Sequence, residues 1–585
     1  MRALTSQIPQ MVLALTLAVT GCSGASYQEY AEPRQLDPIP DGTVSLYRAP
    51  WRANVRTVAA YDALQGVGVY YKHTPPWSED EHAAVMTQMA AAGVKRLRLA
   101  PHHTLYIHKD WTSPSKEELE RLRNEFRGCK RAEIRPCVTF VHIPPAGKPN
   151  TDELEKWYKR DWNKGFAGLL PVGEAGTPSY QAFLDKTYLS LTFVLNEARA
   201  SGFTEPNSYD LEMGQNLWWG APAIPNPWPG TTLRDLLPGG RIYEFDRALI
   251  QRARQEGYKE PTFLWSESHH LFDKCVDEEV PPEVAGRACS FYSTGIGPST
   301  KEWFKKALDT WPAPEPMRFL EGDPPELVLA KPESWIADRS RHDSLVALMK
   351  RSRTPIAITS LGTVPAEIEG VASGPLNGWQ IKQRALTRSL AFWLNQGAAF
   401  VLIHSAYEPG SKGKGEMAHS LIPNEIKPLE FRWQDAAPLV TLRAFCDGLA
   451  GAKPVKQVRQ FSFKYSLEQD PILIPATGKA GPMKASDLVA LLPFQIDERT
   501  FAVAAYVVTP NVAVPMEPVK ITLSVDGNIV GKATLLRPYT GAKGEVEPNS
   551  IALTMGPAEN PVTFYETLLT FDLCDDVTWV RFELK

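Results

Sequence analysis

Two apolar segments of the chain carry carboxylates in alternating positions. Asp210 and Glu212 lie two residues apart in one segment, and Trp265 and Glu267 lie two residues apart in another. Side chains two residues apart in a β-strand point to the same side, so each pair shares one side of its strand. Two carboxyl groups at one site can cleave a glycosidic bond, because one protonates the leaving oxygen and the other attacks the anomeric carbon or activates water. Glu212, on the first segment, and Glu267, an acid at the end of the second, are candidates for such a pair.

Each of these carboxylates also has a non-catalytic interpretation. Glu212 could form a structural ion pair with Arg98, and Glu267 could accept a hydrogen bond from a sugar hydroxyl. Glu408 follows the segment 403–407 and is a further acid at a strand end, which an ordinary loop position explains better.

Histidines and tryptophans follow several of the strand-like segments. Imidazoles can bond sugar hydroxyls, bind a metal or carry protons, and any one of them could equally be a structural residue. We expect no metal and no other cofactor. A metal centre formed by His269, His270 and Asp273 is a remote alternative, because their spacing fits no zinc signature. Trp218 and Trp219 either form a stacking platform for a sugar or pack beneath a loop. The histidines at strand ends are His102, His103, His142, His269, His270 and His404.

From about residue 60 to 408, strand-like apolar runs alternate with amphipathic helical runs. Eight such strands with helices between them predict a (β/α)8 TIM barrel. An open doubly wound sheet is the alternative, but the chain has no Gly-x-Gly-x-x-Gly turn to support it. The expected strands are 66–72, 94–101, 134–143, 208–214, 262–270, 288–295 (with 327–331 as a rival), 355–362 and 398–405. The expected helices include 79–92, 116–127, 180–201, 243–256 and 380–396.

The sequence after about residue 455 has a different pattern. Strand-like segments follow one another without a strong helical period, which predicts an all-β sandwich domain over 455–585. The extended stretch 44–60 either adds strands to this sandwich or caps the bottom of the barrel. The expected strands of the sandwich include 487–493, 501–508, 519–525, 550–555 and 578–584.

The N-terminal residues predict export. Arg2 precedes an apolar run at 11–19, and Val-Thr-Gly-Cys ends at Cys22, as in a secretory signal. This ending resembles the bacterial lipobox, which implies that residues 1–21 are removed and that Cys22 is lipidated; an ordinary signal peptide is the alternative. We expect a tether over 22–45, the barrel with its N-terminal extension over 46–454, and a lipid-anchored location in the bacterial cell envelope.

Charge gives no reason to expect an anionic partner. Lys and Arg number 63 and Asp and Glu number 67, for a formal net charge of −4 without long runs of one sign. This composition offers no electrostatic basis for binding nucleic acid or an anionic membrane surface. We expect a monomer that binds carbohydrate and contacts the membrane only through its lipid anchor.

Six cysteines remain after the lipobox, and an oxidising compartment permits disulfides between them. Sequence neighbours suggest Cys129–Cys137 and Cys275–Cys289, which would leave Cys446 and Cys574 as a third pair. Free buried thiols are an equal alternative.

Three segments carry a resemblance to a known group of enzymes. They are AGVKRLRL at 92–99, LEMGQN at 211–216 and TPIAITSLG at 354–362. These runs resemble, in order and spacing, the second, fourth and seventh strand motifs of the clan of (β/α)8 retaining glycosidases that includes the family 39 xylosidase-like enzymes. The resemblance implies a barrel followed by a C-terminal sandwich, and an activity on carbohydrate.

The chain departs from the clan at both catalytic positions. The clan's acid/base glutamate corresponds to Asn216, and its nucleophile corresponds to Ser360, whereas Glu212 matches a non-catalytic strand glutamate. An amide is no useful proton donor, and a serine without a base is a poor nucleophile toward an anomeric carbon.

Two main hypotheses follow. The chain is either a glycoside hydrolase that uses relocated carboxylates such as Glu212 and Glu267, or a pseudoglycosidase that binds glycans without cutting them. A structural envelope lipoprotein without a ligand is a remote third. The residues expected to contact the glycan are Arg98, His103, His142, Asn216, Trp218, Trp219, Trp265, His269, Ser360 and His404.

Overall fold

The structure is a computed structural model of the chain. It describes residues 57–71, 76–99, 116–140, 175–213, 241–267, 280–291, 354–361, 375–376, 378–407, 420–423, 426–460, 463–474, 482–509, 514–526, 529–540, 546–552, 554–557 and 566–585.

Eight parallel strands close into a barrel. The first strand, β2, pairs with the last, β9, through Val67 and Val401, so the sheet has no open edge. Each of the eight predicted strands is present, and the closed barrel excludes the open sheet; the rival segment 327–331 lies outside the described residues. The strands follow the chain order β2 (Val67–Tyr71), β3 (Arg96–Leu99), β4 (Arg135–Phe140), β5 (Tyr209–Met213), β6 (Pro261–Glu267), β7 (Gly286–Phe291), β8 (Ile356–Leu361) and β9 (Phe400–His404).

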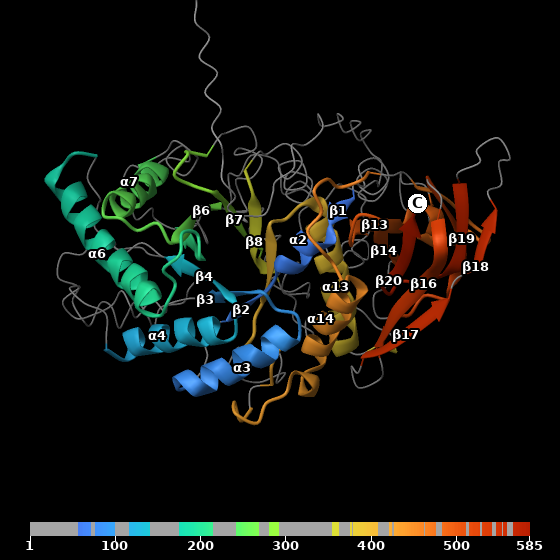
Figure 1. Ribbon diagram of the computed structural model, residues 1–585, viewed down its shortest axis with the longest axis horizontal. Coiled ribbons are helices and arrows are strands. Elements are labelled where there is room, and N and C mark those ends of the chain that lie inside the picture. The colour runs from blue at the N-terminus through green and yellow to red at the C-terminus, as the bar shows by residue number, and fades with distance from the viewer. Residues whose placement is uncertain are drawn as a thin grey trace, which may run out of the picture.

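Helices lie on the outside of the barrel (Figure 1). In α3 the Ser78 side chain caps the helix and Glu81 returns the bond, and buried Val85, Met86 and Met89 face inward. All five predicted helices are present. The described helices of this part are α2 (Ala60–Gln65), α3 (Glu79–Ala91), α4 (Lys116–Arg131), α6 (Pro178–Ala200), α7 (Arg241–Gln255), α13 (Gly378–Gln396) and α14 (Ala437–Gly448), with a short 3-10 turn η5 (Trp433–Asp435).

The C-terminal part consists of two antiparallel sheets and a small hairpin, as the predicted sandwich requires. The six-stranded sheet has the order β1-β13-β14-β20-β16-β17, and the four-stranded sheet has the order β10-β15-β19-β18. The strands are β10 (Phe463–Leu467), β11 (Ile472–Ile474), β12 (Met483–Lys484), β13 (Val489–Gln495), β14 (Thr500–Val507), β15 (Val519–Asp526), β16 (Ile529–Thr540), β17 (Val546–Ala552), β18 (Thr554–Pro557), β19 (Glu566–Leu573) and β20 (Thr578–Leu584), with a 3-10 turn η6 (Ala485–Asp487).

Two details of this domain refine the sequence predictions. The N-terminal strand β1 (Val58–Ala59) pairs in parallel with β13, so the described end of the 44–60 stretch joins the sandwich. The segment 550–555 is not one strand, because its first part belongs to β17 in one sheet and its second part to β18 in the other.

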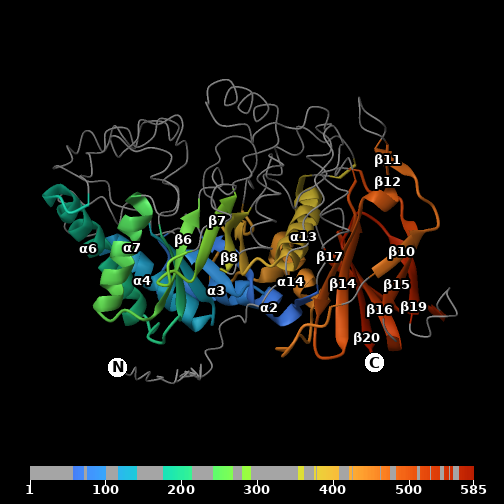
Figure 2. The same cartoon turned by 90° about the horizontal axis from the view of Figure 1, so that it is seen from above.

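The helices α13 and α14 lie between the barrel and the sandwich (Figure 2). Buried Arg388 on α13 donates from Nε to the Asp575 carbonyl at 2.9 Å, and Arg384 Nη2 lies 3.0 Å from Asp576 Oδ2. Asn395 Nδ2 donates to the Pro493 carbonyl at 2.9 Å. Polar contacts therefore fix α13 to the sandwich domain.

Four cysteines whose side chains are described are free and buried: Cys129, Cys137, Cys446 and Cys574. The suggested pairs Cys129–Cys137 and Cys446–Cys574 are therefore wrong. Cys137 belongs to the apolar cluster inside the barrel, whereas Cys129 packs in the cluster between strands and helices, so a strand separates the two. The side chains of Cys275 and Cys289 lie outside the description.

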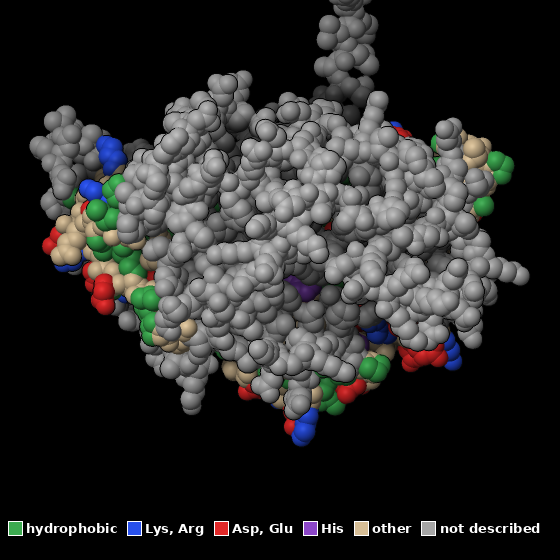
Figure 3. Space-filling model, turned by 180° about the vertical axis from the view of Figure 1, so that it is seen from behind, with side chains coloured by type: hydrophobic (Ala, Val, Ile, Leu, Met, Phe, Trp, Pro, Cys, Tyr) green, Lys and Arg blue, Asp and Glu red, His purple; other side chains and the backbone are tan. Residues whose placement is uncertain are grey.

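The described surface carries charges of both signs. Acidic and basic side chains lie close together at the periphery of the face shown in Figure 3. No helix in the part of the chain that the structure describes has the length and apolar character needed to cross a membrane.

Gly448, the last residue of α14, lies close to the sandwich. A Cβ atom built on Gly448 would lie 2.3 Å from Trp579 Cε2, and Trp579 on β20 is itself buried. The missing side chain therefore makes room for the indole, which also packs against Phe445 at a ring distance of 5.5 Å.

We predict that Gly448→Ala destabilises the protein by about 1–3 kcal/mol, because an overpacked interface must shift. Chemical denaturation followed by circular dichroism measures this loss. The double variant G448A/W579F should lose less than the sum of the single losses. Arg443→Ala is the control on the same helix, since it removes an exposed ion pair with Asp447 and a hydrogen bond to the Ala91 carbonyl but leaves the contact of Gly448 with Trp579 unchanged. Equal losses in G448A and R443A would contradict the packing argument.

Candidate functional site

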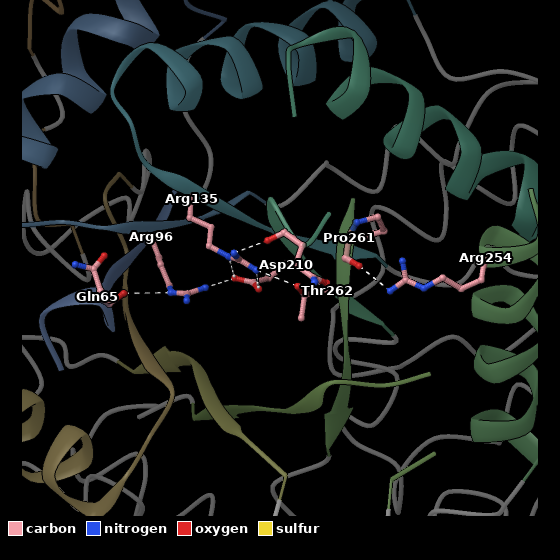
Figure 4. A network of polar contacts seen from close by, with 8 residues as sticks. Gln65, Arg96, Arg135, Asp210, Arg254, Pro261 and Thr262 are labelled. Atoms are coloured by element: carbon pink, nitrogen blue, oxygen red, sulfur yellow. Dashed lines mark hydrogen bonds and ion pairs between the residues drawn. The ribbon is translucent and has the colours of Figure 1, made fainter. Parts of the chain in front are cut away.

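A charged cluster occupies the amino end of the barrel (Figure 4). Arg135 Nη2 lies 2.6 Å from Asp210 Oδ1 and 3.0 Å from Thr262 Oγ1, and Arg96 also pairs with Asp210. Burial opposes the charge of Asp210, but the guanidinium groups of Arg135 and Arg96 outweigh it and lower the pKa of this carboxyl. Sites in such barrels lie at the opposite, carboxyl end, so this cluster is structural.

One layer further along the barrel, Arg98 and Glu212 form a second ion pair. Arg98 Nη2 lies 2.6 Å from Glu212 Oε2, and both side chains have 0% exposure. The sequence placed Asp210 and Glu212 on one side of their strand, and both do face the interior. The alternative interpretation of Glu212 as a structural partner of Arg98 is thus confirmed as a contact.

Hydroxyl groups occupy the remaining positions around this pair. Glu212 Oε1 accepts bonds from Thr359 Oγ1 at 2.9 Å and Ser266 Oγ at 3.2 Å, and its Oε2 accepts one from Thr139 Oγ1 at 3.1 Å. Arg98 Nε donates to Thr139 Oγ1 at 2.7 Å, and Nη1 donates to the Thr359 carbonyl at 2.9 Å. Both oxygens of the Glu212 carboxylate therefore have partners inside the barrel.

A bulge in β8 directs two consecutive residues into the barrel. The pairing of β7 with β8 passes from Cys289–Ile358 to Ser290–Ser360, and that of β8 with β9 passes from Ile358–Val401 to Leu361–Ile403. Thr359 bonds Glu212, and the next residue, Ser360, also points inward. Bulges re-aim side chains in this way and are frequent beside active sites.

Ser360 meets a histidine from the neighbouring strand. Its Oγ lies 3.1 Å from His404 Nδ1, and both residues are buried. Tyr70 connects this pair to the charged layer below, since its ring lies 5.1 Å from that of His404 and 4.6 Å from the Arg98 guanidinium. We call Tyr70, Ser360 and His404 the mouth cluster.

The structure brings together four of the residues predicted to form the site: Arg98, Glu212, Ser360 and His404. Trp265 lies elsewhere, because its ring packs 4.4 Å from Tyr243 of α7, on the helix side of β6, and is 2% exposed. These are the contacts of a core residue. Ser266, its neighbour in the chain, faces the interior instead.

The structure does not describe the side chains of the remaining predicted site residues. Glu267 is the last residue of β6, where its backbone pairs with Cys289; its side chain is outside the description. No group of three metal-binding side chains occurs among the described residues. The predicted site residues that lie outside the described residues are His103, His142, Asn216, Trp218, Trp219 and His269, together with the lipidation site Cys22.

The sequence analysis missed Tyr70, Thr139, Ser266 and Thr359. Tyr70, Thr139 and Ser266 occupy inward positions by strand alternation, which is a signal that alternation alone could have given once the inward side was known. Thr359 and Ser360 break that alternation, so only the strand pairing reveals that both face inward.

No family model and no curated protein sequence matches the chain. Solved structures similar to it include a family 39 glycoside hydrolase from Bacteroides cellulosilyticus WH2, with 12% identity and a TM-score of 0.42 over 90% of this chain and 82% of that one. An endo-β-1,4-mannanase from Thermotoga petrophila has 11% identity and a TM-score of 0.36, covering 85% and 97% of the two chains. A GH5-4 broad specificity endoglucanase from Clostridium longisporum has 12% identity and a TM-score of 0.38, covering 67% and 99%. These similarities are distant, and the barrel is established by its own strand pairing.

We predict that Glu212→Gln lowers the free energy of unfolding by about 3–5 kcal/mol, because it leaves the Arg98 charge buried without its partner. Urea unfolding followed by circular dichroism measures this change. The double variant R98M/E212L should lose less than R98M and E212L together, since it removes both buried charges.

Glu430→Gln is the matched control, because Glu430 pairs with Lys427 at 3.2 Å while both side chains are more than two-thirds exposed, at 71% and 78%. Such a pair contributes at most about 1 kcal/mol. A Glu212 with only a catalytic role would lose turnover in E212Q at unchanged stability, and that result would contradict the structural assignment.

Proposed function

We propose that this chain is a carbohydrate-active protein that binds a glycan at the carboxyl end of its barrel. The supporting observation is that the three segments of the glycosidase-like pattern meet in space. Arg98 from the first, Glu212 from the second and Thr359 from the third share direct hydrogen bonds. The mouth cluster lies just beyond them, at the end where (β/α)8 enzymes place their sites.

The finer proposal concerns the chemistry of that site. Glycoside hydrolysis needs two carboxyl groups that can exchange protons or attack. Glu212 is paired with Arg98 and bonded by three hydroxyls, which favours a positioning role for it. Glu267 is then the candidate for a carboxyl role, because it is the last residue of β6 at the carboxyl end of the barrel. Strict alternation would give it the helix side that Trp265 occupies, so the proposal requires that the chain departs from alternation where the strand ends. The alternative is a pseudoglycosidase, which keeps the binding site and lacks the second carboxyl.

We predict that at least one poly- or oligosaccharide in a panel raises the melting temperature, because a ligand that prefers the native state stabilises it, by about 2.7 kcal/mol at 100 times its Kd. If the same glycan is cut, Glu267→Gln should lower turnover by about 1000-fold or more and spare binding. Released sugar and thermal shift are the two readouts.

Glu583→Gln is the matched control, since Glu583 forms a half-exposed pair with Arg499 on the sandwich at 2.9 Å. Binding without cleavage favours the pseudoglycosidase. A panel that neither shifts the melting temperature nor yields sugar would contradict the carbohydrate function.

A lipid anchor at Cys22 is the second part of the proposal. The Val-Thr-Gly-Cys run ending at Cys22 supports it. We predict that mass spectrometry of the mature N-terminus finds a lipid-modified Cys22 and no residue from 1–21. Cys22→Ala should move the protein from the membrane fraction to the soluble fraction. An unmodified N-terminus at another residue would overturn the assignment.

A further inference from the structure

Ser360 is not the isolated serine that its sequence context indicates. Its Oγ lies 3.1 Å from His404 Nδ1, within the distance at which an imidazole can take a hydroxyl proton. The two residues come from β8 and β9, strands that are adjacent in the barrel. The bulge in β8 creates the contact, because Thr359 already occupies the regular inward position and bonds Glu212.

A comparison with Ser266 shows what is particular about this pair. The Ser266 hydroxyl donates to the Glu212 carboxylate at 3.2 Å, and that carboxylate is already neutralised by Arg98. Such a bond gives a buried hydroxyl its partner, but it supplies no base for proton transfer. An imidazole differs, because it can accept a proton from one oxygen and return it to another near neutral pH.

We propose that Ser360 and His404 are a nucleophile and its general base, and that the mouth cluster cleaves carboxylic esters carried on sugar hydroxyls. The sugar part of this inference rests on the proposed carbohydrate function, whereas the acyl-transfer part does not. A serine alkoxide suits a carbonyl carbon, because the leaving alcohol can take its proton from the imidazolium. A glycosidic bond would require a separate carboxylic acid to protonate the leaving oxygen.

The reaction balances with water as the only co-reactant. Ser360 Oγ attacks the carbonyl carbon, forms a new C–O bond and gives its proton to His404. The original ester C–O bond then breaks, and the sugar oxygen leaves as a hydroxyl with that proton. Water, deprotonated by the same imidazole, attacks the acyl-serine, and the carboxylic acid leaves as Ser360 regains its proton.

Tyr70 is a positioning residue for Ser360 and His404. Its ring meets the imidazole of His404 edge-on at 5.1 Å, and it also lies 4.6 Å from the Arg98 guanidinium. The His404 imidazole thus lies between the Tyr70 ring and the Ser360 hydroxyl. The Tyr70 ring is in turn held by the guanidinium of the Arg98–Glu212 ion pair. Preorganisation of this kind limits the freedom of a base and favours proton transfer in one geometry.

The experiment treats the full chain with p-nitrophenyl acetate and with diisopropyl fluorophosphate, both small enough for a buried site. Phosphorylation of Ser360 Oγ with loss of fluoride, located by peptide mass spectrometry, reports the nucleophile. We expect wild type to be labelled at Ser360 in preference to its other serines and to release p-nitrophenol. Ser360→Ala should abolish both signals.

His404→Asn separates the base from the hydrogen bond, since the amide can replace the Nδ1 contact without taking the proton. We expect labelling of Ser360 to slow by about 100-fold or more in H404N. His404→Gln is the second variant should H404N fail to unfold cooperatively. Ser486→Ala is the control, because its hydroxyl bonds Asp470 at 2.7 Å in the sandwich, and it should label like wild type.

Two results would overturn the proposal. One is the absence of label at Ser360 in wild type, and the other is equal labelling of Ser360 in wild type and in a folded His404 variant. Neither depends on a glycan. Labelling with no thermal shift from any glycan would leave the acyl transfer standing and refute the carbohydrate function instead.

Discussion

The buried ion pair between Arg98 and Glu212 is the contact on which the barrel interior depends. Removing two charges from water is expensive, and their attraction offsets that cost only if the remaining donors and acceptors are also bonded. Here Thr139, Ser266 and Thr359 supply those bonds. Five strands contribute to one polar unit, so a slip of any of them by one residue would leave a buried polar group without its partner.

The charged interior also separates the two ends of the barrel. At the amino end, Asp210 forms ion pairs with both Arg96 and Arg135. The Arg98 layer is likewise complete, and between the two lie apolar residues such as Leu264 and Phe400. The polar groups of the mouth cluster lie beyond the Arg98 layer, on the carboxyl-terminal residues of β2, β8 and β9.

Much of this architecture could be predicted from the sequence, because hydrophobic periodicity fixes strand and helix identity locally. The eight strands, the five helices and the shared side of Asp210 and Glu212 all follow from it. Alternation shows which residues share a face of a strand, but it does not show which face points into the barrel. For this reason the sequence predicts Trp265 as a site residue, although it lies on the helix side of β6. The bulge that turns Ser360 inward depends on pairing with two other strands, and no local pattern encodes it. Neighbouring cysteines likewise proved to lie on opposite sides of a strand.

The contact between Ser360 and His404 changes the meaning of the departure from the glycosidase pattern. A glutamate at that position reaches into the barrel and carries its own negative charge. A serine is shorter and neutral, so it can act only with a base supplied by a neighbour, and β9 presents an imidazole within 3.1 Å. In the proposed site, Ser360 and His404 therefore act together, and the proton acceptor is on a second strand. The bulge in β8 sets the spacing between Ser360 and His404. The irregularity that makes the inward direction of Ser360 unpredictable from the sequence therefore also brings Ser360 into contact with His404.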